Sequence, residues 1–99
     1  MPVYLIIDIQ VHDQKKYLEY IEKAKPVLEK FGGRYLARGS EITTIAGDWH
    51  PERIVLVEFE SMAQLKASFA CPEYKAIAHL RTESTKSRTI IVEGYEEEL

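Results

Sequence analysis

Residues 3–11, VYLIIDIQV, alternate between two kinds of position without a break. A period of two predicts a β-strand, because successive side chains of a strand point to opposite faces. One face is wholly aliphatic and consists of Val3, Leu5, Ile7, Ile9 and Val11. The other face is half polar and consists of Tyr4, Ile6, Asp8 and Gln10. One face of such a strand is expected to pack against a hydrophobic core. The other face is too apolar to lie fully exposed to water and needs partial cover.

The segment after this strand has the period of a helix. Its apolar residues recur at spacings of four and three, at Tyr17, Ile21, Ala24, Leu28 and Phe31. This stripe predicts one buried helix face. Asp13 is a suitable N-cap, and Gly32-Gly33 is a suitable end, since glycine adopts the left-handed conformation that follows many helices. Pro26 lies within the stretch and is expected to bend the helix.

A strand, a turn and a further strand are predicted next. Residues 34–47 are interpreted as a strand with a bulge at Gly39-Ser40. Residues 48–52 are expected to form the hairpin loop, and residues 53–60 the following strand.

The last part of the chain predicts helices and a final strand. Ser-Met-Ala-Gln, at residues 61–64, matches a capping box and predicts a helix start. Residues 72–81, PEYKAIAHLR, predict a second short helix, since proline stands at its favoured first position. Residues 82–86 are expected to form a polar loop, and residues 88–95 a strand.

The order of these elements is β-α-β-β-α-β, which is typical of a ferredoxin-like α+β plait. We expect helices on one face of an antiparallel sheet, with the first and third strands at its centre and parallel to each other. A chain of 99 residues fits one domain over residues 1–99, with the acidic end at about residues 95–99 frayed.

Composition narrows the classes of function. The net charge is −3 and no basic-aromatic pattern accompanies it, which argues against a nucleic-acid partner. The N-terminus lacks the basic region and cleavage site of a signal peptide, and no apolar run reaches membrane-spanning length. The single cysteine, Cys71, excludes an internal disulfide and fits a reducing compartment. We therefore expect a cytoplasmic protein without a membrane partner.

The sheet face away from the helices is expected to be too apolar for water. On the last strand, Ile90 and Val92 are assigned to the helix side. The helix-free face then consists of Tyr4, Ile6, Asp8, Leu36, Arg38, Ile54, Leu56, Glu58, Thr89, Ile91 and Glu93. A patch of this kind marks an interaction site, and a second copy of the chain fits it. We therefore predict a homodimer in which two plaits pack face to face as a dimeric α+β barrel.

Charged residues on that face are candidates for ligand chemistry. If the central strands are parallel, Asp8 and Glu58 lie at one end of the sheet, and Arg38 lies near them. Glu93 is expected at the other end. Two neighbouring carboxylates raise the pKa of one of them unless an arginine compensates, which suits acid-base catalysis. A structural ion pair uses the same arrangement and is favoured, although both interpretations stay open.

Four blocks of the chain resemble an uncharacterised bacterial family, domain of unknown function 1330. The blocks are FGGRYLARG, GDWHPERIVLVEFES, CPEYKAIAHLR and IIVEGY, and the resemblance extends from about residue 3 to residue 95. It implies the dimeric α+β barrel and no established activity. The positions that match the blocks are Arg38, Trp49, Glu58, Tyr74, Arg81 and Glu93. Cys71 departs from the pattern, since a serine or aspartate usually precedes Pro-Glu-Tyr and caps the short helix better.

The candidate ligand-binding residues are Asp8, Arg38, Trp49, Glu58, Tyr74, His79 and Arg81. Trp49 is interpreted either as a lid over the sheet edge or the dimer seam, which is favoured, or as a wall of the ligand pocket. Tyr74 is a core residue or one whose hydroxyl reaches the pocket. His79 pairs with neighbours on its helix or serves as an acid, a base or a haem ligand. The three histidines share no metal-ligand spacing, so neither a metal nor a cofactor is expected.

Two kinds of function are open. In the first, the chain binds a small molecule in the barrel space between two protomers, as a binding protein or as a cofactor-free enzyme of monooxygenase or isomerase type. In the second, it is a non-catalytic homodimer with a stress-related or regulatory binding role. A haem-degrading enzyme is disfavoured, because the chain contains no asparagine for the first strand and Trp49 is expected on a loop.

Overall fold

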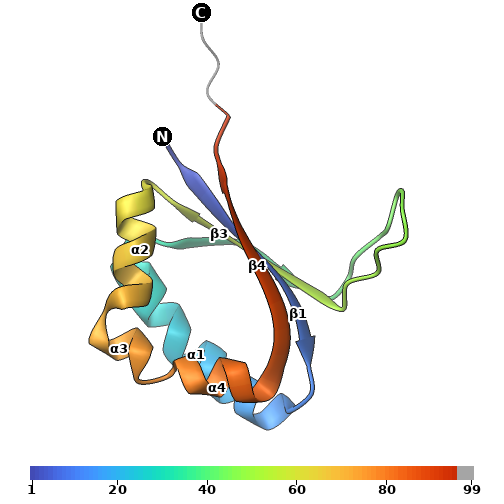
Figure 1. Cartoon of the computed structure of the whole chain (residues 1–99), viewed down its shortest axis with the longest axis horizontal. Helices are drawn as coiled ribbons and strands as arrows, with labels where there is room; N and C mark the ends of the chain where they lie inside the picture. The colour runs from blue at the N-terminus through green and yellow to red at the C-terminus, as the bar shows by residue number, and fades with distance from the viewer. Residues whose placement is uncertain (96–99) are drawn as a thin grey trace, which may run out of the picture.

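The computed structural model describes residues 1–95 and contains one four-stranded sheet, with all helices on one side of it (Figure 1). The strands lie in the order β2-β3-β1-β4. The elements are β1 (Val3–Val11), α1 (Gln14–Lys30), β2 (Arg34–Gly39), β3 (Arg53–Phe59), α2 (Met62–Ala70), α3 (Pro72–Lys75), α4 (Ala78–Ser84) and β4 (Thr85–Glu93). The predicted ferredoxin-like α+β fold, with its antiparallel sheet, is confirmed. The acidic end falls largely outside the described residues.

The two central strands run antiparallel, so the expectation that they are parallel was wrong. Val3 lies opposite Phe59, and Ile9 lies opposite Arg53. The cause is the topology: helix α1 returns the chain so that β2 runs in the direction of β1, and the hairpin then brings β3 back between them in the opposite direction. Residues late in β1 therefore lie beside residues early in β3.

The faces of β1 and β3 are as predicted. The buried side consists of Val3, Leu5, Ile7, Ile9, Val55, Val57 and Phe59. It packs against Tyr17, Tyr20, Ala24 and Leu28 of α1 and against Leu65, Tyr74 and Leu80. Of the predicted helix stripe, Ile21 and Phe31 are partly buried and pack against the same core.

The faces of β4 are the reverse of the prediction. Ile91 lies opposite Leu5, and Thr89 lies opposite Ile7, so both face the helices. Ile90 and Val92 face the other way. The sequence Thr-Ile-Ile-Val has no alternation, so its pattern does not specify which side turns inward.

A β-bulge changes the facing of β2. The register shifts between Tyr35 and Ala37, so Leu36 is the additional residue, and the bulge does not lie at Gly39-Ser40. Arg38 lies opposite Val55 as a result, on the helix side of the sheet. The assignment of Arg38 to the helix-free face is corrected accordingly.

Residues 40–52 form an irregular arm and no strand. The arm projects from the body of the molecule and is drawn in green in Figure 1. Within the arm, Ile45 is 95% exposed, and Trp49 is 53% exposed. The predicted continuation of the strand to residue 47 was wrong, because this segment has no neighbouring strand to pair with.

The helix boundaries follow the predicted caps. The Asp13 side chain accepts a hydrogen bond from the Lys16 amide, and the Ser61 hydroxyl oxygen accepts one from the Gln64 amide. Gly32, with φ of 87°, occupies the left-handed conformation after α1. Residues 72–81 are divided between α3 and α4, and β4 begins directly after α4. The predicted polar loop at residues 82–86 is therefore absent. None of the helices in residues 1–95 is long and apolar enough to cross a membrane.

Candidate functional site

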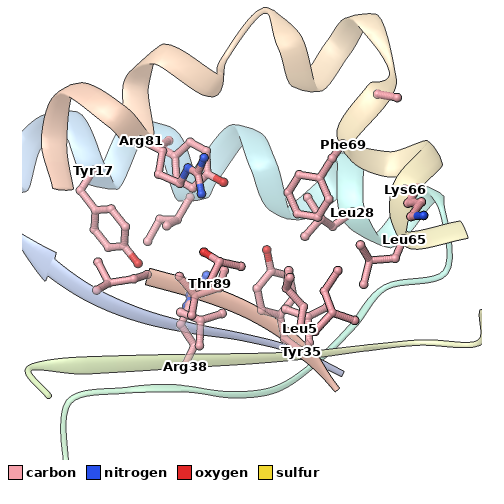
Figure 2. Close-up of a pocket in the computed structure, with 18 of the residues that line it drawn as sticks. Leu5, Tyr17, Leu28, Tyr35, Arg38, Leu65, Lys66, Phe69, Arg81 and Thr89 are labelled. Carbon is pink, nitrogen blue, oxygen red and sulfur yellow. The ribbon is translucent and has the colours of Figure 1, made fainter. Parts of the chain in front are cut away.

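A cavity of about 550 Å³ lies between the helices and the sheet (Figure 2). Most of its walls are apolar, and they include Leu5, Ile7, Ile9, Ile21, Leu28, Val55, Val57, Leu65, Phe69, Ala70 and Ile91. Such a volume falls within the range of small-molecule sites. The cavity lies on the opposite side of the sheet from the predicted barrel space.

Two arginines bring positive charge to this apolar space. Figure 2 shows Arg81 reaching from the helix side, with Arg38 on the sheet side. The Nε atom of Arg81 is buried and has no hydrogen-bond partner within residues 1–95. A buried donor without a partner costs about 1–3 kcal/mol, and more when the group is charged. This arginine is therefore the polar group of the cavity that most needs an acceptor.

Three tyrosines line the same cavity and stay neutral near pH 7. Burial raises the pKa of Tyr35 to about 12, although the nearby Arg38 opposes this shift. Burial likewise raises the pKa of Tyr17, and it raises that of Tyr20 further. Their hydroxyl groups are suited to hydrogen bonding and not to accepting a proton from a substrate.

Tyr74 lies in the core behind this wall. Its hydroxyl oxygen is 2.9 Å from that of Tyr20, and its ring packs edge-on against Phe69, with centroids 4.7 Å apart. Its first interpretation, a core residue, agrees with its exposed fraction of 4%. Its hydroxyl is connected to the cavity through Tyr20, which lines the cavity directly.

No histidine, aspartate or glutamate within residues 1–95 lines the cavity. The other ionisable groups of its lining are Lys66 and Lys75, which are exposed and lie at its edge. The cavity therefore has cationic and neutral groups but lacks the usual general bases. It is suited to holding an anion or a neutral molecule.

The predicted cluster of Asp8, Glu58 and Arg38 does not form. Because β1 and β3 are antiparallel, Asp8 lies opposite Ile54, whereas Glu58 lies opposite Tyr4 at the other end of the sheet. Arg38 lies on the opposite face. The shared carboxylate site is therefore corrected to two separate ion pairs.

Asp8 is paired with Arg88 of β4. Arg88 Nη2 donates to Asp8 Oδ2 over 2.7 Å, and Trp49 Nε1 donates to the same oxygen over 3.2 Å. The bond from Arg88 is the main cause that lowers the pKa of Asp8, and the bond from Trp49 adds to it. Two predicted residues, Asp8 and Trp49, are thus brought together. Their partner Arg88 was missed, because it is identified only by the register of β4.

Glu58 is paired at the far end of the helix-free face. Its Oε1 atom is 3.2 Å from Arg34 Nη2. The hydrogen bond to this carboxylate raises the pKa of the Tyr4 hydroxyl. Glu93 lies opposite Val3 at this end of the sheet, as expected, but on the helix side. His79 is exposed on α4 and is not among the residues that line the cavity.

The helix-free face combines these ion pairs with exposed aliphatic side chains. Ile90 is 59% exposed and Val92 is 44% exposed. Ile6, Ile54 and Leu56 lie between them and the arm and are only half-buried. The arm adds Ile42, Ile45 and Trp49, so an apolar surface continues from the sheet onto the arm.

Solved structures with this fold include proteins with and without a described activity. RPA0582 of Rhodopseudomonas palustris, a protein of unknown function, is 19% identical, with a TM-score of 0.83 over 97% of this chain and 84% of its own. SnoaB of Streptomyces nogalater, a cofactor-independent oxygenase, is 9% identical, with a TM-score of 0.70 over 97% of this chain and 95% of its own. A dimeric ferredoxin-like protein of unknown function from Jannaschia sp. CCS1 is 12% identical, with a TM-score of 0.65 over 95% of this chain and 100% of its own.

At these identities the similarity shows a shared fold and no more. No protein with a curated description matches the chain. The model of one family, described as a domain of unknown function (DUF1330), matches residues 2–95, which is nearly the whole chain. The chain therefore belongs to the family of domain of unknown function 1330.

Proposed function

We propose that this protein binds a small, mainly apolar molecule in the cavity between its helices and its sheet, and that it does so as a homodimer. The cavity itself is the observation that carries the proposal, since its volume of about 550 Å³ and its mainly apolar walls are typical of ligand sites. We place the ligand within each protomer and not between the two sheets. Arg38 and Arg81 are the predicted site residues that belong to it, with Tyr74 supporting Tyr20 behind it.

The homodimer uses the helix-free face. Exposed Ile90 and Val92, together with the arm, form a surface whose burial contributes on the order of 1 kcal/mol per aliphatic side chain. Asp8, Trp49 and Glu58 belong to this face in the proposal and act in assembly, not in ligand binding.

One core runs through residues 1–95, in support of a single domain over residues 1–99. The single thiol, Cys71, suits the cytoplasm.

A second candidate function is that of a cofactor-free oxygenase. The similarity in fold to SnoaB, a cofactor-independent oxygenase, is the observation that favours it. The lining of the cavity opposes it, since no carboxylate or imidazole within residues 1–95 is placed there to deprotonate a substrate. Ligand binding without catalysis, including a regulatory role, fits this lining better.

Calorimetry with the neutral probe 2-acetylnaphthalene tests the cavity. We expect the wild-type protein to bind the probe. Ile91 lines the cavity and is 40% exposed, so the larger indole ring of Ile91→Trp fills part of the cavity. This variant is therefore expected to bind the probe at least tenfold more weakly. Ala67→Trp is the control, because Ala67 is exposed on α2 and is absent from the lining. Equal binding by both variants would place the probe elsewhere and refute the proposed site.

Sedimentation tests the dimer separately. The wild-type protein is expected to sediment at twice the 11.4 kDa of the chain. Ile90→Glu places a charge on the helix-free face and is expected to yield the monomer. Leu18→Glu is the matched control, since Leu18 is 51% exposed on α1, away from the sheet. A monomeric wild-type protein at micromolar concentration would overturn the proposed assembly.

A further inference from the structure

The charges around the cavity are all of one sign. The four charged side chains of its lining are Arg38, Lys66, Lys75 and Arg81. None of the ion pairs within residues 1–95 involves any of them. Clefts that combine low-dielectric walls with one sign of charge concentrate the opposite charge. The occupant that best complements this lining is therefore an anion.

Arg81 is the group placed to fix the position of such an anion. A guanidinium group keeps its charge in proteins and offers five N–H donors in one plane, a geometry that matches carboxylate oxygens. The Nε donor of Arg81 is buried without a partner, and Figure 2 shows the side chain reaching into the cavity from the helix side. The hydroxyl groups of Ser84 and Thr85 bond to main-chain carbonyls, that of Arg81 included, and so do not satisfy its side chain.

The rest of the lining specifies the other end of the occupant. Phe69, Tyr17 and Tyr35 contribute rings, and aliphatic side chains from the sheet complete the walls. Figure 2 shows Tyr35 pointing from the sheet towards the same space as Arg81. Flat apolar molecules stack favourably on such rings. The volume of about 550 Å³ admits a ring system of two or three fused rings.

The geometry points to an aromatic carboxylate as the class of ligand, with its carboxylate on Arg81 and its rings against the aromatic and aliphatic walls. Arg38 and the two lysines attract it electrostatically from the edge of the cavity. This inference rests on the proposed binding function and specifies the chemistry of the ligand. It also assigns Arg81, one of the candidate ligand-binding residues predicted from the sequence, as the specificity-determining residue.

Two probes of equal shape test the inference. Calorimetry at pH 7.5 compares 2-naphthoate, which is anionic, with 2-naphthamide, which is neutral. We expect the wild-type protein to bind 2-naphthoate at least tenfold more tightly, and this preference to weaken at high salt. Arg81→Met keeps an unbranched apolar stem and is expected to lose at least tenfold in affinity for 2-naphthoate and less than twofold for 2-naphthamide. Lys23→Met removes one charge of the exposed pair with Glu19 and is expected to change neither affinity.

The outcomes separate the inference from the function on which it rests. Equal binding of the two probes by the wild-type protein overturns the anion preference and leaves the binding cavity standing, and it does not depend on the folding of any variant. Binding of neither probe overturns the proposed function as well. A preference that survives in folded Arg81→Met, with its circular dichroism unchanged, overturns the role of Arg81.

Discussion

The hydrogen bond between the hydroxyl groups of Tyr20 and Tyr74 allows a direct test of how a buried polar pair contributes to the free energy of unfolding. The two residues are 8% and 4% exposed, and their oxygens are 2.9 Å apart. In Tyr74→Phe, the hydroxyl of Tyr20 loses its partner, and a buried polar group without a partner costs about 1–3 kcal/mol. A loss of about 2 kcal/mol lowers the Tm of a domain of this size by roughly 8–16 °C.

The double variant is expected to behave differently from the sum of the single variants. Replacing both partners by apolar groups of the same shape is close to neutral, since no unpaired hydroxyl is left behind. Tyr20→Phe combined with Tyr74→Phe is therefore expected to be more stable than additivity predicts by at least ~1 kcal/mol. Urea unfolding followed by circular dichroism, at one fixed protein concentration, measures all three variants.

The control for this cycle is Tyr95→Phe. Tyr95 is 88% exposed, so loss of its hydroxyl is expected to change the free energy of unfolding by less than about 0.5 kcal/mol. Strict additivity of the two core substitutions would refute the reasoning, because it would show that the hydroxyl groups do not depend on each other.

Two further predictions concern the helix-free face and the end of α1. The pKa of Asp8 is lowered in the folded state, chiefly by the hydrogen bond from Arg88. The stability that this pair contributes is therefore fully present above the ordinary pKa of 3.8. It is lost as the pH falls through the lower pKa of the folded state. Thermal unfolding between pH 2 and 6 should show a smaller acid loss in Asp8→Asn than in the wild-type protein, and identical pH profiles would contradict this. Gly33→Ala is expected to destabilise by about 1–3 kcal/mol, because a Cβ atom there would lie 2.8 Å from the Leu28 carbonyl oxygen. Gly39→Ala, with nothing within 4 Å of its Cβ position, should cost less in the same urea titration, and an equal cost would refute the steric argument.

The sequence was informative where a strand alternates. The inward side chains of β1 and β3 were predicted correctly. One face of β1 is wholly aliphatic, and in β3 Glu58 marks the face opposite Val55, Val57 and Phe59. The final strand was assigned the wrong way round, because Ile90, Ile91 and Val92 are consecutive and fit either face. Its pairing with β1 is what decides the matter, and that pairing is a property of the folded chain.

The candidate site was recovered only in part. Arg81 was selected from the family blocks, and Arg38 from these blocks and from an expected place on the helix-free face that was wrong. The cavity between the helices and the sheet was not foreseen, because it depends on how far the helices stand from the sheet. The proposed meeting of Asp8 and Glu58 failed because it depended on strand direction. Each acidic residue has instead an arginine on a neighbouring strand, Arg88 and Arg34, at distances that only the register supplies.

The extra residue in β2, Leu36, determines on which face of the sheet the residues after it lie. Without a bulge at Leu36, Arg38 would stand opposite Ile54, on the helix-free face of the sheet. With the bulge, the same guanidinium group stands opposite Val55 and lines the cavity between the helices and the sheet. Inserting or deleting one residue before this arginine therefore moves its charge from one face of the sheet to the other, even where the aligned residue is still an arginine. For this chain, the number of residues between Gly32-Gly33 and Arg38 is therefore as informative as the arginine itself.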